Sequence, residues 1–264
     1  MSDYTLKSDE AEDARLESQG TALYGGPQFL DEYLKRAKPA TVLDVGCGTG
    51  VVSRYIAKHY PNIRVVAIDS DGERITRNEA GLKTDPLPNL EFRTDNVYHL
   101  TFPAETFDLT FCRFFLMHQN HSVMALDEMR RVTKDGGMVV AHEGIHDGIW
   151  LEPRREAFSH VLGRWIEFMN GKHQDASIGL KLNKLFTGVR LRDVEVSVLP
   201  HSATGDDPLF PQYIKNWREH IPSLREGLSK MVSEEQFVRM EHELALCSDT
   251  DFYLELTAVA CGRK

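Results

Sequence analysis

The stretch Val42–Gly50, which reads VLDVGCGTG, decides the fold of this chain. It begins with apolar and β-branched residues around a single acid, which predicts a buried parallel strand. Glycines then alternate at positions 46, 48 and 50 before a helical pattern starts. Because glycine has no Cβ, a ligand can lie against this backbone, and the following helix offers free N–H groups and the positive end of its dipole. The stretch therefore predicts a binding site for a nucleotide-type cofactor.

The spacing of the glycines argues against a dinucleotide. A dinucleotide-binding turn would carry glycine at positions 46, 48 and 51, but Val51 occupies the third. Asp44, inside the strand, also suits an amine ligand better than a pyrophosphate. A nicotinamide-dependent dehydrogenase is therefore the weaker interpretation, and binding of a nicotinamide cofactor would revive it.

Outward from this turn, short apolar strands alternate with amphipathic helices. Strands are predicted at residues 41–45, 64–69, 90–94, 107–112, 137–142, 194–199 and 252–261, and helices at 10–23, 28–37, 51–59, 71–81 and 122–132. Such alternation is typical of a parallel sheet that is covered by helices on both faces. The chain is therefore predicted to be an α/β protein.

Two mainly helical insertions, at about 146–190 and 201–248, interrupt the alternation in the second half of the chain. All three tryptophans fall within them. Most of their aromatic side chains are expected to pack the helices onto the sheet, while Trp150 and Trp165 are candidate substrate contacts in an apolar pocket. Because no repeat or low-complexity linker divides the chain, we predict a single domain over 1–264 with a helical cap.

The segment Asp44–Gly50 matches the first motif of the class I S-adenosylmethionine-dependent methyltransferases at every position. The chain resembles this family over about 20–145 and 190–264. The resemblance implies a Rossmann-like, seven-stranded, mostly parallel sheet with helices on both faces and a helical cap. One departure is Asp135, which stands where the family usually has proline in a Lys-Pro-Gly-Gly turn and which affects that turn only.

The resemblance also implies which residues hold S-adenosylmethionine. Asp69 would bind both ribose hydroxyls, because a carboxylate can accept two hydrogen bonds at once. Asp95 would accept the adenine amine, with Asn96 as the alternative. Tyr24 follows an amino-terminal helix that looks similar to the one in ubiquinone-pathway and natural-product methyltransferases. The expected cofactor-binding set is Tyr24, Asp44, Gly46, Cys47, Gly48, Gly50, Asp69, Ser70, Asp95, Asn96 and Arg113.

Residues 142–146 read HEGIH and match the H-E-x-x-H signature of zinc proteases. That signature needs a helix, whereas this stretch follows a predicted strand, where the two histidines would lie about 13 Å apart. No metal site is therefore expected. The carboxyl end of a parallel strand faces the ligand crevice, so His142 or His146 is the candidate general base, and Glu143 and His118 are candidate substrate contacts.

Composition limits the partners of the chain. The 264 residues carry 31 Lys and Arg against 40 Asp and Glu, and a formal net charge of −9 gives no electrostatic reason to bind nucleic acid. The first ten residues are too acidic and polar for a secretory signal, and no apolar run approaches the length of a membrane span. We expect a cytoplasmic protein, with a homodimer left open. The scattered cysteines fit reduced thiols, and they argue against an arsenite methyltransferase.

The expected function is transfer of a methyl group from S-adenosylmethionine to a small organic acceptor, with S-adenosylhomocysteine as the co-product. Methylation on oxygen or nitrogen is favoured, and methylation on carbon is possible. A hydroxyl acceptor would use a general base, whereas an amine or an activated carbon needs less assistance. The alternative is an enzyme of the same fold that binds S-adenosylmethionine but catalyses a rearrangement or cyclisation. Stoichiometric formation of S-adenosylhomocysteine separates the two.

Overall fold

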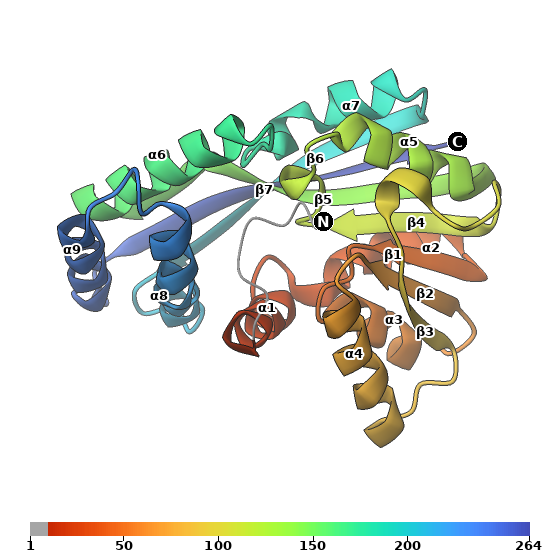
Figure 1. Cartoon of the computed structure of the whole chain (residues 1–264), viewed down its shortest axis with the longest axis horizontal. Coiled ribbons are helices and arrows are strands. Elements are labelled where there is room, and N and C mark those ends of the chain that lie inside the picture. Colours follow the sequence, from red (N-terminus) through yellow and green to blue (C-terminus); the bar gives the residue numbers. More distant parts are fainter. Residues whose placement is uncertain (1–9) are drawn as a thin grey trace.

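The computed structural model describes residues 10–264, and these residues form a seven-stranded sheet with the strand order β3-β2-β1-β4-β5-β7-β6 (Figure 1). Strands β1 to β5 pair in parallel, and β7 runs antiparallel to its neighbours β5 and β6. The predicted Rossmann-like, mostly parallel sheet is therefore confirmed. The strands are β1 (Thr41–Val45), β2 (Arg64–Asp69), β3 (Leu90–Thr94), β4 (Phe107–Arg113), β5 (Thr133–Glu152), β6 (Arg192–Thr204) and β7 (Phe252–Arg263).

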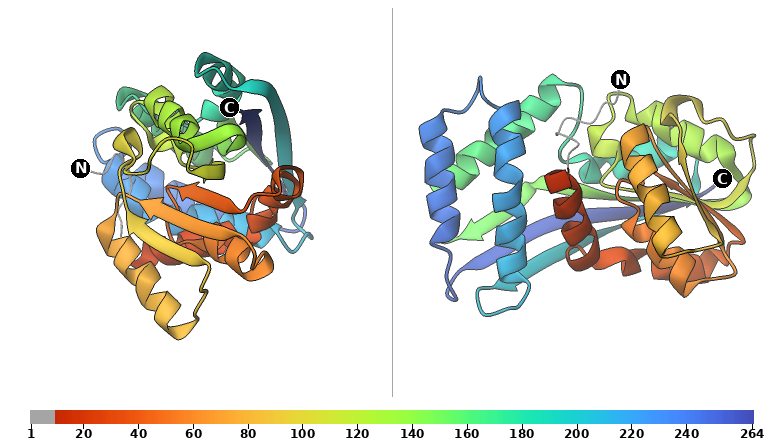
Figure 2. Two further views of the ribbon diagram at one scale, coloured as in Figure 1. Left: turned by 90° about the vertical axis from the view of Figure 1, so that its right-hand side faces the viewer. Right: turned by 60° about the horizontal axis from the view of Figure 1, so that its bottom comes forward.

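Helices cover both faces of the sheet, as Figure 2 shows. Side chains of successive strand residues point to opposite faces, so Leu43 and Val45 enter one apolar core while Val42 enters the other. Helices α2, α3 and α4 pack on the Val42 face, and α5 and α7 pack on the opposite face. The helices are α1 (Glu10–Ala22), α2 (Asp31–Ala37), α3 (Val51–His59), α4 (Gly72–Thr84), α5 (Ser122–Val132), α6 (Glu156–Gly171), α7 (Leu182–Gly188), α8 (Phe210–Gly227) and α9 (Glu234–Ala245).

Strands β5 and β6 are longer than the sequence pattern predicts. β5 continues to Glu152, and it pairs with β7 on both sides of a register shift between Ile145 and Trp150. β6 continues to Thr204 along the whole of β7. The predicted cap boundaries at 146 and 201 are therefore too early, because backbone pairing with β7 keeps these residues extended. The segment that contains the H-E-x-x-H pattern lies within β5, so it is extended rather than helical.

The cap helices α6, α8 and α9 lie over the extended ends of these long strands, at the left of Figure 1. Their buried aromatic side chains, among them Phe158, Trp165, Trp217 and Phe237, share a core with the sheet. Helix α1 lies between α8 and α4 (Figure 2, right). Within residues 10–264, no helix combines the length and apolar character that a bilayer span requires.

Candidate active site

The three glycines after β1 have different roles. All three have a positive φ, which side chains other than glycine rarely adopt. A Cβ built on Gly46 would lie 2.1 Å from the ring of Phe115, and one on Gly50 would lie 2.6 Å from Phe92, so both positions need glycine for packing. A Cβ on Gly48 would meet nothing within 4 Å, although Gly48 lines a cavity. Gly48 is therefore where a ligand can lie directly against the backbone.

Asp69 fixes this loop from the end of β2. One carboxylate oxygen accepts the Gly48 N–H at 3.0 Å, and the other accepts the Asp71 N–H at 3.0 Å. Burial raises the pKa of Asp69. Each oxygen keeps a lone pair that can accept a hydroxyl, and Asp69 lines the cavity together with the exposed Ser70. This arrangement fits the expected pair of ribose hydroxyls.

Asp44 is a buried acid beneath the same loop. The Ser53 hydroxyl donates to one of its oxygens at 2.5 Å, and burial raises the pKa of Asp44 to about 7. A cationic ligand beside it would restore the ionised form, because an opposite charge favours the carboxylate. Cys47 lines the cavity at the loop itself, and burial raises the pKa of its thiol. An open backbone at Gly48 and an acid on either side fit S-adenosylmethionine, which carries a sulfonium, an amine and a ribose.

Asp95 and Asn96 follow β3 and line the cavity, but their side chains also hold their own turn. Asp95 accepts the N–H of Asn96 at 2.8 Å, and it accepts both the N–H and the hydroxyl of Thr101. Asn96 accepts the Tyr98 N–H at 3.0 Å. Both residues thus shape the wall that includes Val97 and Tyr98, and a lone pair of Asp95 is what remains for the adenine amine.

Arg113 and Tyr24 line the cavity as well, and both hold the end of α1 and the residues that follow it. The Arg113 guanidinium donates to the carbonyls of Gly20 and Leu23, each at 3.1 Å, and burial lowers its pKa to about 10. The Tyr24 hydroxyl donates to Glu255 at 2.8 Å. These two side chains therefore connect the amino-terminal segment to β4 and β7.

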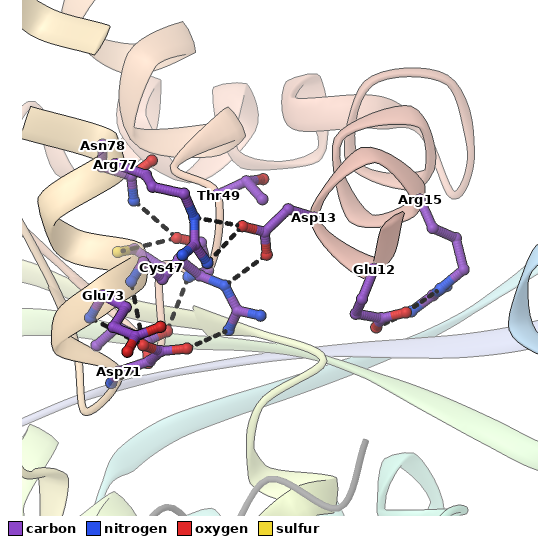
Figure 3. Close-up of polar contacts among 12 residues, drawn as sticks. Glu12, Asp13, Arg15, Cys47, Thr49, Asp71, Glu73, Arg77 and Asn78 are labelled. Atoms are coloured by element: carbon purple, nitrogen blue, oxygen red, sulfur yellow. Dashed lines mark hydrogen bonds and ion pairs between the residues drawn. The ribbon is translucent and has the colours of Figure 1, made fainter. Parts of the chain in front are cut away.

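Helix α1 covers the cavity, and ion pairs hold it in place. Asp13 accepts from Arg74 at 2.8 Å and from Arg77 at 2.9 Å, both on α4, as the dashed lines in Figure 3 show for Arg77. On its other side, Arg15 donates to Asn216 of α8 at 3.0 Å and forms a buried ion pair with Glu12. Arg15, Leu16, Gln19 and Gly20 of α1 line the cavity.

The cavity has a volume of about 340 Å³, within the range of small-molecule sites. One half consists of the glycine loop and the ends of β2 and β3. The other half lies under the cap and is aromatic and polar. Its lining includes Arg15, Met117, His118, Gln119, His146, Trp165, Asn216, Trp217, His220 and Glu255. The two halves fit a cofactor and an acceptor that meet inside one cavity.

The cap half carries histidines that burial keeps uncharged near neutral pH. Desolvation lowers the pKa of His118 to about 3 and of His146 to about 4, and it lowers the pKa of His220 well below the ordinary value. His118, His146 and Trp165 are predicted site residues that the structure brings to the cavity. His220 and Glu255 are additional. An acid within the alternating pattern of β7 is the signal that could have pointed to Glu255.

Four predicted residues do not reach the cavity. Gly50 lies against the ring of Phe92 instead. His142 is fully buried, where its Nε2 lies 2.8 Å from the Thr257 hydroxyl and Phe29 covers its ring. Glu143 is also fully buried and binds backbone N–H groups. Trp150 is half exposed, and its indole N–H donates to Glu152. The geometry therefore supports His146 rather than His142 at the acceptor, and a structural role for Glu143.

Removing the carboxylate of Asp69 tests the ribose assignment. The Asp69→Ala variant should bind S-adenosylmethionine more weakly by roughly 1.5–3 kcal/mol, the range for hydrogen bonds to a charged group. Calorimetric titration measures this loss, and Asp135→Ala, at an exposed position near the start of β5, is the control. Unchanged affinity in the Asp69 variant would contradict the assignment.

Releasing α1 tests its role as a cover. The Asp13→Ala variant breaks the ion pairs to α4, and we expect S-adenosylhomocysteine to dissociate about tenfold faster, the equivalent of about 1.4 kcal/mol. Stopped-flow measurement of dissociation checks this rate, with Glu10→Ala at the exposed start of α1 as the control. Equal dissociation rates in both variants and the wild type would show that α1 does not retain the ligand.

Comparison with known proteins agrees with this geometry. Residues 42–137 match a family model described as a methyltransferase domain. An uncharacterized methyltransferase of Schizosaccharomyces pombe is 35% identical over 121 residues, which are 44% of this chain and 43% of that protein. The 2-methyl-6-phytyl-1,4-hydroquinone methyltransferase of Synechocystis is 35% identical over 100 residues, 38% of this chain and 30% of that protein.

Phosphoethanolamine N-methyltransferase 2 of Haemonchus contortus, solved with S-adenosyl-L-methionine, has a similar fold. It superposes with a TM-score of 0.60 at 17% identity, over 95% of this chain and 56% of that one. The fold is thus that of the class I S-adenosylmethionine-dependent methyltransferases. Residues 42–137 of this chain are similar to a methyltransferase domain. The chain spans less than half the length of the two curated relatives.

Proposed function

We propose that this chain transfers the methyl group of S-adenosylmethionine to a small organic acceptor, on oxygen or nitrogen, and releases S-adenosylhomocysteine. A single observation carries the proposal: the cavity that begins at the open backbone of Gly48 continues without interruption to the histidines and tryptophans beneath the cap. The bound cofactor supplies an activated methyl group, and the residues of this chain align the acceptor with it.

The cap half of the cavity, rather than the half around the glycine loop, bears on the identity of the acceptor. The family match ends at residue 137, so it includes the glycine loop and Asp69 but not His146, Trp165 or Glu255. The identity of the acceptor therefore rests on the cap half of this chain. The cap half of this cavity of about 340 Å³ is lined by Trp165 and Trp217, and it suits a small, partly aromatic molecule rather than a polymer. The relative from Synechocystis, whose name specifies a hydroquinone, is consistent with such an acceptor.

Parallel calorimetric titrations with S-adenosylmethionine, S-adenosylhomocysteine and NAD test the cofactor. We expect micromolar binding of the two sulfur compounds and none of NAD. Incubation with S-adenosylmethionine and a panel of phenols, quinols and amines should then yield one S-adenosylhomocysteine per methylated product. A product formed without S-adenosylhomocysteine would favour the rearrangement or cyclisation alternative, and binding of NAD alone would contradict the proposal.

A further inference from the structure

Glu255 lines the cavity, and one of its two carboxylate oxygens accepts no hydrogen bond from the described residues. The hydroxyls of Tyr24 and Tyr253 both donate to its Oε2, at 2.8 and 2.6 Å. Among the hydrogen bonds of residues 10–264, none ends on Oε1, although the side chain is only 3% exposed and lines the cap half. A carboxylate oxygen that faces a cavity without a protein donor can accept a hydrogen bond from a ligand. Oε1 is therefore placed to accept a proton from a bound ligand.

His146 faces that oxygen across a short gap. Its Nε2 lies 4.0 Å from Glu255 Oε1, which is too far for a hydrogen bond, yet one oxygen atom between them can reach both. A hydroxyl fits because it both donates and accepts: it can donate to Oε1 and accept from an N–H on His146. An alkylammonium has donors only, and a reacting carbon has neither. The gap therefore fits a hydroxyl and does not fit an alkylammonium.

The surrounding charges favour a neutral acceptor. Arg15, the cation in this half, is engaged by Glu12 through two hydrogen bonds, at 2.8 and 2.7 Å. Burial keeps His118 and His220 uncharged at neutral pH. The described titratable groups that face Glu255 are His146 of β5, His201 of β6, Tyr213 of α8, Tyr253 of β7 and Tyr24. None of these carries a charge near pH 7, so a phosphate or carboxylate on the acceptor would find no free countercharge among them.

Building on the proposed function, we propose that Glu255 is the general base for a neutral hydroxyl acceptor, a phenol or comparable alcohol, whose oxygen lies between Glu255 Oε1 and His146 Nε2. The acceptor O–H bond breaks as its proton moves to Oε1, an oxygen lone pair forms the new bond to the methyl carbon, and the electrons of the methyl–sulfur bond pass to sulfur. His146 positions the oxygen, and Glu255 afterwards returns the proton to solvent.

The titration of Glu255 is consistent with this role. Burial raises its pKa to about 7, which the hydrogen bonds from Tyr253 and Tyr24 partly oppose. A general base works best when its pKa lies near the operating pH, and His146, with a pKa of about 4, is the weaker base of the two. The rate of methyl transfer should therefore rise with pH and level off just above 7.

The Glu255→Gln variant tests the base and leaves the shape of the site unchanged. An amide oxygen can still accept from both tyrosines, so folding and S-adenosylmethionine affinity should stay close to wild type. Methyl transfer to phenols should fall by about 10²–10⁴-fold, the usual contribution of general-base catalysis. The Glu235→Gln variant, on the exposed surface of α9, is the control and should keep the wild-type rate.

A spectroscopic measurement gives a readout that does not depend on turnover. With S-adenosylhomocysteine bound, 4-nitrophenol should bind to the wild type, and its phenolate absorbance should appear at higher pH than in the Glu255→Gln variant, by at least one pH unit, because a carboxylate beside the phenol disfavours the phenolate. Equal midpoints, or failure of every phenol in the panel to bind, would overturn the role of Glu255. Failure of the wild type to bind S-adenosylmethionine would instead overturn the proposed function.

Discussion

The Gly48→Val protein should fold and yet bind S-adenosylmethionine at least 100-fold more weakly than the wild type, a loss of about 2.7 kcal/mol or more. A Cβ at this position meets no protein atom within 4 Å, so the added side chain does not clash with the chain itself. It projects instead into the space beside the loop, where the cofactor is expected. Calorimetric titration with S-adenosylmethionine and S-adenosylhomocysteine measures the loss.

A valine at position 48 also strains the backbone, and a control variant must separate this effect from the blocking of the cofactor. Gly48 has a φ of 54°, which costs a residue with a side chain about 1–2 kcal/mol. Gly136 has a φ of 73°, an equally open Cβ position and no place on the cavity. The Gly136→Val variant should therefore lose a similar amount of stability in thermal unfolding and bind the cofactor normally. Normal cofactor binding by a folded Gly48→Val protein would show that the glycine turn is only structural.

The Glu143→Ala variant should lower the free energy of unfolding by about 3 kcal/mol. The Glu143 carboxylate accepts the N–H groups of Phe115 at 3.1 Å, Leu116 at 2.8 Å and Met117 at 3.3 Å. Alanine leaves all three donors buried without this partner. Cofactor affinity should fall as well, because Phe115 and Met117 line the cavity. Chemical unfolding at several pH values measures the effect, and Glu143→Gln, which keeps one acceptor oxygen, should lose less.

The difference in stability between the wild type and the Glu143→Ala variant should depend on pH. Burial raises the pKa of Glu143 to about 7, above the ordinary value of 4.5. The folded protein therefore keeps a proton that the unfolded chain releases, and the contribution of Glu143 to stability decreases as the pH rises from about 4.5 to 7. The gap in stability between wild type and Glu143→Ala should be larger at pH 5 than at pH 8. A constant gap would contradict the raised pKa.

The cofactor half of the site could be predicted from the sequence because it is contiguous. Between Val42 and Asn96, each candidate lies near the end of a strand or directly after it, and these ends lie at the same edge of a parallel sheet. Alternation along a strand also places His142 and Glu143 on opposite faces. Alternation does not indicate which face another element covers. Here the ring of Phe29 covers His142, and the backbone N–H groups of residues 115–117 donate to the Glu143 carboxylate.

The acceptor half could not be predicted in the same way because distant segments form it. Glu255 becomes a site residue only because β7 pairs with β5 and brings it next to His146. His220 and Asn216 depend on how α8 lies over the sheet, which no local pattern specifies. The sequence pattern underestimates the lengths of β5 and β6 for a related reason. Pairing with β7 keeps extended some residues that the pattern assigns to the cap.

Strands β5 and β7 run from the parallel part of the sheet to the cap, and this continuity limits how the molecule can open. They pair from Met138 to Ile145 next to β4 and again from Trp150 to Glu152 under the cap. The sheet is thus a common floor rather than two lobes joined by a hinge. Access for ligands must come from movement of the helices above that floor, with α1, which touches both halves, as the element whose displacement uncovers cofactor and acceptor together.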